Sequence, residues 1–192
     1  MQSGSIDSRL ITVGVALLII VLIGIGFWVQ RRRVRTSELR RRFGSEYERT
    51  VNEHGSINKA QAKLEDREAR VERLKIRSLG ATERERFVAD WQSVQSHFVD
   101  RPQSAVTEAD QLIASLMQAR GYPLADFDQR AADISVNHPR LIEDYRSAHW
   151  IAARSGSSET STEELRTAML QYRTLFDELV ETTVPEHVQS LA

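Results

Sequence analysis

The feature that most constrains this chain is an uncharged apolar stretch near the amino terminus, LITVGVALLIIVLIGIGFWV, at residues 10–29. Twenty residues of α-helix extend about 30 Å, which is roughly the hydrocarbon thickness of a bilayer. A buried helix of a globular protein is rarely apolar on all sides, and a cleaved signal peptide has a shorter apolar region and a small-residue cleavage site. We therefore expect an uncleaved transmembrane helix over 10–29, preceded by a short tail at 1–9.

The charges that flank this stretch predict its orientation. Seven arginines lie between residues 31 and 42, whereas only Arg9 precedes the stretch. The positive-inside bias places the arginine-rich side in the cytoplasm of a bacterial plasma (inner) membrane and the amino-terminal tail outside. The lipid bilayer is then the first expected partner, and recognition of specific anionic lipids stays open. The residues expected at the membrane interface are Trp28, Arg31, Arg32, Arg33 and Arg35.

Composition excludes several classes of function. Residues 31–77 hold 15 Lys and Arg against 8 Asp and Glu, a net +7, and residues 78–192 hold 10 against 18, a net −8. An acidic distal part repels phosphate, so we expect no nucleic acid partner. The chain has no cysteine, which excludes disulfides, thiolate metal sites and a cysteine nucleophile. No two of the five histidines are three or four residues apart, so we expect no metal and no cofactor.

Apolar residues after the stretch recur at spacings of three and four, which indicates short helices packed side by side. The fold class expected is all-α: one amino-terminal transmembrane helix, a basic juxtamembrane helix and a small cytoplasmic bundle. Helices are expected near 57–77, 82–98, 102–119, 124–135, 138–152 and 162–184, with 102–119 the best candidate for a central helix. The predicted divisions are a juxtamembrane stalk at 30–56, a bundle core at 57–154, a polar linker at 155–161, a carboxyl-terminal helix at 162–184 and a tail at 185–192.

Local signals mark some helix ends. Thr82 with Glu85, and Ser161 with Glu164, match the capping box, in which two side chains satisfy the exposed backbone donors of a first turn. Gly121 follows a periodic apolar run at the place where a left-handed residue ends a helix, a conformation that glycine adopts without a Cβ clash.

The segment RGYPLADFDQRAADISVNHP at 120–139 is the richest in polar side chains. Arg130 lies at helical spacing from Asp126 and Asp133, so we expect surface ion pairs there. His138 and His149 are about 16 Å apart along a shared helix, too far to bind one metal ion. The chain has no glycine-rich phosphate loop, G-x-S-x-G or H-E-x-x-H motif, so no catalytic residue is assigned. A hydrolase or metal-binding enzyme that uses Asp and His of 120–149 is the less favoured alternative.

Four short motifs are spread along the chain: RFGSEY at 42–47, RGYP at 120–123, DFDQRAAD at 126–133 and YRTLFDEL at 172–179. In these motifs the chain resembles a bacterial family of small single-pass membrane proteins that share RFGxEY, RGYP, DFxQRAAD and YRxLFxEL. The resemblance implies a bacterial membrane setting and no particular activity. It points to a binding surface made of Arg120, Tyr122, Asp126, Arg130, Asp133, His138, Tyr145, Arg146 and His149.

The function that we expect is a membrane-anchored cytoplasmic helical domain acting as a protein-interaction or scaffolding module. Its partner would be a protein at the cytoplasmic face of the membrane, because tethering raises the effective concentration of weakly bound partners. The alternative is a structural membrane protein that forms homo-oligomers, and an exposed apolar stripe on the 57–77 helix or on the last helix would favour it.

Overall fold

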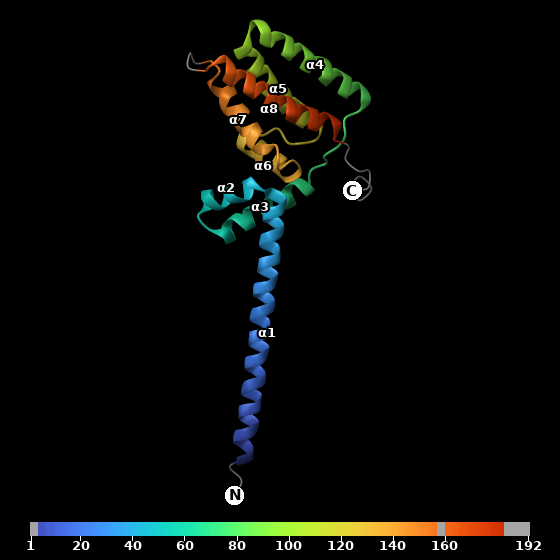
Figure 1. The fold of residues 1–192 in the computed structure, drawn as a ribbon. Helices are drawn as coiled ribbons and strands as arrows, with labels where there is room; N and C mark the ends of the chain where they lie inside the picture. Colours follow the sequence, from blue (N-terminus) through green and yellow to red (C-terminus); the bar gives the residue numbers. More distant parts are fainter. Residues whose placement is uncertain (1–3, 157–159, 183–192) are drawn as a thin grey trace. The chain divides into compact units, whose positions relative to one another are not determined.

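All regular structure in the described residues, 4–156 and 160–182 of a computed structural model, is α-helical (Figure 1). The all-α prediction is therefore confirmed for this part of the chain. The helices are α1 (Gly4–Phe43), α2 (Ser45–His54), α3 (Ile57–Glu72), α4 (Ala81–Asp100), α5 (Pro102–Ala119), α6 (Phe127–Asn137), α7 (Ile142–Arg154) and α8 (Thr162–Glu181).

The chain divides between Arg41 and Arg42 into two compact units. The first unit is helical from Gly4 onward, and α1 continues without interruption through the apolar stretch and the arginines to Phe43. Gly44 then has a φ of 54°, a conformation that ends the regular helix. The predicted stalk at 30–56 is thus continuous with the apolar stretch up to Phe43 and separates from α2 at Gly44.

In the part of the chain that the structure describes, no helix is both long enough and apolar enough to cross a membrane. This finding contradicts the predicted transmembrane helix at 10–29 and the predicted inner-membrane location. Among the predicted interface residues, the side chains of Trp28, Arg32 and Arg33 lie outside the described ones, and Arg31 and Arg35 are exposed.

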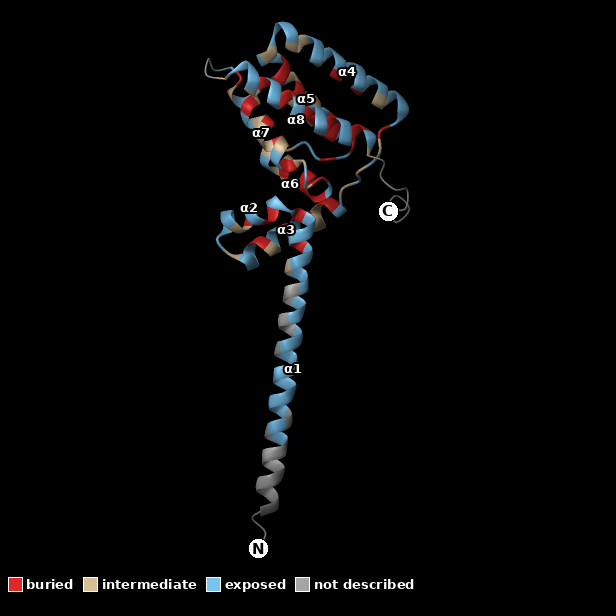
Figure 2. Cartoon of the chain, in the orientation of Figure 1, coloured by how far each residue is buried: buried red, intermediate tan, exposed pale blue. Residues whose placement is uncertain are grey.

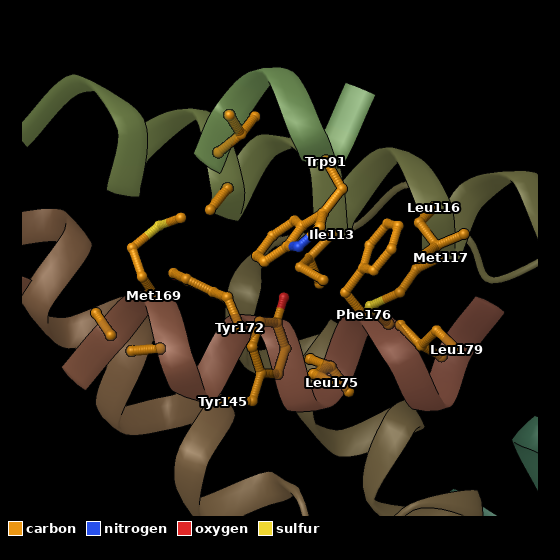
Figure 3. Close-up of a cluster of buried hydrophobic side chains, with 14 of the residues drawn as sticks. Trp91, Ile113, Leu116, Met117, Tyr145, Met169, Tyr172, Leu175, Phe176 and Leu179 are labelled. Carbon is orange, nitrogen blue, oxygen red and sulfur yellow. The ribbon is translucent and has the colours of Figure 1, made fainter. Parts of the chain in front are cut away.

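The second unit is built on an apolar cluster shared by α4 to α8. The α5 helix packs against α4, α7 and α8, which makes it the central helix that its broad apolar face predicts. Trp91 of α4 stacks on Phe176 of α8 with ring centroids 4.8 Å apart. Ile113 and Leu116 of α5 and Tyr172 of α8 are buried in the same cluster (Figure 3). Buried residues lie on the inward faces of these helices, and the outward faces are exposed (Figure 2).

The α2–α3 hairpin, residues 45–72, is a separate layer of this unit. Its two helices pack on each other, and they contact the bundle at α6 and α7. Its buried apolar side chains are Tyr47, Ala60, Leu64 and Val71. Among the described residues, these four lie outside the apolar cluster of α4 to α8. The hairpin therefore has a small apolar core of its own.

The turn after α5 packs directly against the connection from α3 to α4. Gly121 has a φ of 95°, which confirms the predicted left-handed glycine. A Cβ atom on Gly121 would lie 2.3 Å from the backbone oxygen of Lys75. The backbone N–H of Arg77 donates to the carbonyl of Arg120 over 2.9 Å. The turn and the connection are therefore in backbone contact, with no space between them for a side chain.

One predicted helix start is confirmed, and the other is displaced. Ser161 Oγ accepts from the N–H of Glu164 over 3.2 Å, and Glu164 Oε2 accepts from the N–H of Ser161 over 2.8 Å, which is the predicted capping box. At α4 the cap is instead Gly80, whose N–H donates to Glu83 Oε2 over 3.0 Å. The helix starts earlier than predicted because the extended backbone at Gly80 precedes it, so Thr82 lies inside the first turn.

Candidate partner-binding surface

The structure divides the nine predicted binding residues among separate groups instead of gathering them on one surface. Three of the groups lie at contacts between helices, Asp126 caps α6, and the binding role of the nine remains a prediction. The groups are Arg120 with Tyr122 and His138, then Asp133 and Arg146, then Arg130 with Tyr145 and His149, and Asp126 by itself.

The first group lies where the ends of α5, α6 and α8 meet. The Arg120 side chain is 1% exposed, and its Nη1 donates to the carbonyl of Leu179 over 2.5 Å. Burial lowers the pKa of Arg120. His138 Nδ1 lies 3.3 Å from Glu178 Oε1, and burial lowers the pKa of His138 despite that carboxylate. His138 also ends α6, since its N–H donates to a carbonyl of that helix, so the next helix starts at Ile142 and not at His138 as predicted.

The predicted ion pairs of Arg130 are replaced by other contacts. Asp126 caps α6, because its Oδ1 accepts from the N–H of Gln129 over 2.8 Å. Asp133 is fully buried, and its Oδ1 accepts from Arg70 Nε over 2.8 Å. Arg130 itself donates through Nε to the hydroxyl of Tyr145 over 3.3 Å. Tertiary packing thus supplies Asp133 with a distant partner, and Asp126 forms a local helix cap, where sequence spacing predicted ion pairs of both with Arg130.

A set of side chains along one side of α7, in which Trp150 is exposed and the other three are half-buried, makes the strongest candidate for a binding surface. Arg146, His149, Trp150 and Arg154 are spaced at i, i+3, i+4 and i+8, which places them along one side of the helix. We call these four residues the α7 stripe. Trp150 is 58% exposed, and the guanidinium carbon of Arg154 lies 3.9 Å from the centroid of its ring. Phe127 of α6 stacks on His149, with centroids 3.6 Å apart and an interplanar angle of 6°.

Two members of the stripe are held in place by carboxylates beneath them. Arg146 Nη2 donates to Glu46 Oε1 of α2 over 3.0 Å. His149 Nδ1 lies 3.0 Å from Asp110 Oδ1 of α5, and the hydroxyl of Tyr172 donates to the same oxygen over 2.8 Å. Because the carboxylate only accepts, His149 presents Nδ1–H to Asp110, and Nε2 is the ring nitrogen that remains for a ligand.

The pKa values in this cluster follow from burial and hydrogen bonding. Burial alone would raise the pKa of Asp110, but hydrogen bonds from His149 and Tyr172 outweigh it, and the pKa is lowered. Burial raises the pKa of Tyr172, and the neighbouring Asp110 carboxylate raises it further. Asp110 is therefore a stable anion, and Tyr172 keeps its proton as a donor to that anion.

The geometry gives little support to the enzyme alternative. Asp126, Asp133, His138 and His149 each have a different partner, so they do not converge on one reacting atom. Within the described ranges, no group of three or more His, Asp or Glu side chains is placed to hold a metal ion. A surface hollow of about 400 Å³ near the start of α8 is lined by residues 100–104, 160, 162 and 165, and none of the predicted residues lines it.

Of the α7 stripe, the sequence analysis predicted Arg146 and His149 as binding residues and did not include Trp150 and Arg154. A signal was present, because the apolar pattern of this helix runs through Ile142 and Tyr145 and leaves Trp150 outside it. A large aromatic residue outside the apolar face of its helix indicates a surface position. Asp110 carries no comparable signal, because its contact with His149 spans 39 residues of sequence.

We compared the chain with protein-family models, with curated proteins and with solved structures, and none of them matches it. The resemblance to the membrane protein family therefore remains a prediction, and the function must be argued from the geometry of the surface.

The lowered pKa of Asp110 predicts a pH-dependent contribution to stability. The folded protein keeps this carboxylate charged at pH values where the unfolded chain, with its ordinary pKa of 3.8, takes up a proton. Its contribution is thus fully present above the unfolded pKa and is lost as the pH falls through the lower folded pKa. We expect Asp110→Asn to cost about 1.5–3 kcal/mol of unfolding free energy at neutral pH, the usual worth of hydrogen bonds to a charged group.

The measurement is urea unfolding of both proteins between neutral and strongly acidic pH. The difference between wild type and Asp110→Asn should shrink as the pH falls below 3.8. A difference that stays constant over this range would contradict the assignment.

Proposed function

We propose that the helical domain at 42–182 is a protein-interaction module that binds an acidic partner segment carrying an apolar side chain. The contact surface proposed is the α7 stripe together with Phe127. The exposure of Trp150 is the observation that carries this proposal, and the charges around it specify the partner.

Trp150 has no packing role that the bundle needs. The apolar cluster of α4 to α8 is formed without it, and 58% of the residue is exposed to solvent. Tryptophan and arginine are the residue types most enriched among side chains that dominate binding energy at interfaces. Arg154 lies over the Trp150 ring, a cation–π contact that limits the freedom of both side chains. Binding then costs less side-chain entropy than it would for two mobile residues.

The charge of the stripe differs from that of its surroundings. Residues 78–192 carry a net −8, yet the stripe contains two guanidinium groups and an imidazole beside two aromatic rings, with Arg146 paired with Glu46 and His149 with Asp110. On the exposed side, Asp128 Oδ1 lies 4.0 Å from Arg146 Nη1. A partner with Asp or Glu side chains would complement this surface and would be repelled by most of the remaining acidic domain, which fixes where it docks.

The proposal is tested by site-specific photo-crosslinking in cells. A benzoylphenylalanine at position 150 should give a covalent adduct with another protein, whereas the same probe at Val99, which is 82% exposed on α4, should not. In the probe-150 chain, Arg154→Glu should reduce the yield by about tenfold or more, because it reverses a charge within the contact. An adduct with the mass of two chains would favour the oligomer-forming alternative. No adduct at position 150, or equal adducts at both positions, would contradict the proposal.

A binding measurement with the purified full chain complements the crosslinking. The probe is a fluorescent synthetic peptide of glutamates with a leucine and a phenylalanine at its centre. Trp150→Ala should weaken its binding by about thirtyfold, the effect of removing a residue that dominates an interface. Leu170→Ala, at a residue 60% exposed on α8, is the matched control and should leave the affinity unchanged. Equal losses in both variants would show that the peptide does not select the α7 stripe.

A further inference from the structure

The α2–α3 hairpin is held on the bundle by charged side chains. Glu46 of α2 is 1% exposed, and its Oε1 accepts from Arg67 Nη1 over 2.7 Å and from Arg146 Nη2 over 3.0 Å. Arg70 of α3 pairs with the buried Asp133 of α6. Two ion pairs therefore join the hairpin to the bundle, Glu46 with Arg146 of α7 and Arg70 with Asp133 of α6, and Arg67 binds Glu46 from within the hairpin.

These contacts leave some hydrogen-bonding capacity unused. Glu46 Oε2 and Asp133 Oδ2 are buried and have no hydrogen-bond partner, and the same holds for Arg67 Nε and Arg146 Nε. A buried ion pair with unsatisfied atoms recovers only part of the cost of removing its charges from water. When the hairpin separates from the bundle, these groups regain hydration, so separation costs less than the opening of an apolar contact of the same size.

The segments around the hairpin confine such a motion to residues 45–72. The apolar cluster of the bundle includes Leu79 but none of the described residues of the hairpin. Just after α3, the N–H of Arg77 is bonded to the carbonyl of Arg120. The chain is therefore hydrogen-bonded to the bundle again within a few residues of Glu72. The apolar cluster of α4 to α8 then stays packed when the hairpin moves.

We propose that the α2–α3 hairpin is an autoinhibitory latch, in which Glu46 occupies Arg146 and so withholds one cation of the α7 stripe from an acidic partner. This inference rests on the proposed function of the stripe. Release of the hairpin breaks the bond from Glu46 to Arg146 and leaves that guanidinium available to a partner carboxylate. The partner and the hairpin compete for the same group, so each weakens the binding of the other.

Hydrogen exchange of the full chain tests the latch without any partner. Glu46→Gln removes the charge that joins Arg67 to Arg146, and backbone amides of residues 45–72 should then exchange about tenfold faster or more, with residues 81–181 unchanged. Replacing both Arg70 and Asp133 by leucine should slow exchange in the hairpin, because an apolar pair docks more tightly than a buried ion pair. Glu72→Gln, an exposed position on the same hairpin, is the matched control.

The outcomes separate the latch from the function of the stripe. If Glu46→Gln leaves exchange of the hairpin unchanged, or raises it equally throughout the bundle, the latch is wrong. The acidic peptide should bind about tenfold more tightly to Glu46→Gln, because this variant frees Arg146. It should bind more weakly to the double leucine variant, because this variant keeps the hairpin on the bundle. Exchange that behaves as expected with peptide affinity unchanged in all variants would retain a mobile hairpin but overturn its inhibitory role. A wild-type chain and a Glu46→Gln chain that both fail to bind the peptide would count against the proposed function itself.

Discussion

Gly121→Ala is expected to lower the free energy of unfolding by about 2–5 kcal/mol, from backbone strain and from crowding. The strain arises because Gly121 has a φ of 95°, which L-residues rarely adopt. The crowding arises because the new Cβ atom would lie 2.3 Å from the oxygen of Lys75 and 3.1 Å from its carbonyl carbon. Both neighbours are backbone atoms, so the connection between α3 and α4 must shift to make room. Equilibrium urea unfolding measures the loss.

Gly55→Ala is the matched control for this prediction. Gly55 has a φ of 62°, and an added Cβ would meet nothing within 4 Å. The control therefore carries the backbone strain without the crowding and should cost about 1 kcal/mol. Equal losses at the two positions would show that the contact between Gly121 and Lys75 does not determine the stability of this turn.

Arg120→Ala is expected to cost about 3–5 kcal/mol, because it deletes one of the largest fully buried side chains of the domain. Arg120→Met keeps most of the side-chain volume and should cost only about 1–2 kcal/mol, chiefly from leaving the carbonyl of Leu179 without its donor. The methionine variant should lose less stability because the Arg120 guanidinium contributes its volume and one hydrogen bond to a neutral carbonyl, while its charge is costly to bury.

Thermal and urea unfolding of both Arg120 variants decide between volume and charge. A methionine variant as unstable as the alanine variant would mean that the guanidinium group, and not the space it fills, stabilises the junction of α5, α6 and α8. An alanine variant as stable as wild type would mean that the junction collapses without loss and that the residue is not a packing element.

The local features of the fold could be predicted from the sequence. Apolar spacing located the helices of the bundle to within a few residues, because amphipathic periodicity depends on neighbours three and four positions away. The capping box of Ser161 and Glu164 and the left-handed Gly121 were likewise predictable, since each is decided within a few residues of chain.

Features that depend on distant contacts were not predictable. The prediction that Arg130 pairs with Asp126 and Asp133 was wrong, because Asp133 instead pairs with Arg70, 63 residues away. Arg146 was expected in a binding surface, but its bond to Glu46 spans 100 residues, and no local pattern indicates it. The apolar stretch at 10–29 predicted a transmembrane helix, which the described part of α1 contradicts.

The sequence alone determined that the domain is helical and where most of its helices lie. It also determined that Gly121 ends α5, because all these features follow from short-range sterics and periodicity. The tertiary structure alone decided which polar residues become buried partners and which stay exposed. The burial of a polar side chain cannot be predicted from its residue type. Asp133 is buried and Asp126 caps a helix end, although both belong to the same motif. The exposure of Trp150 and the charged latch beneath Arg146 are likewise products of helix packing, since each depends on which helix lies against α7 and which side of it faces water.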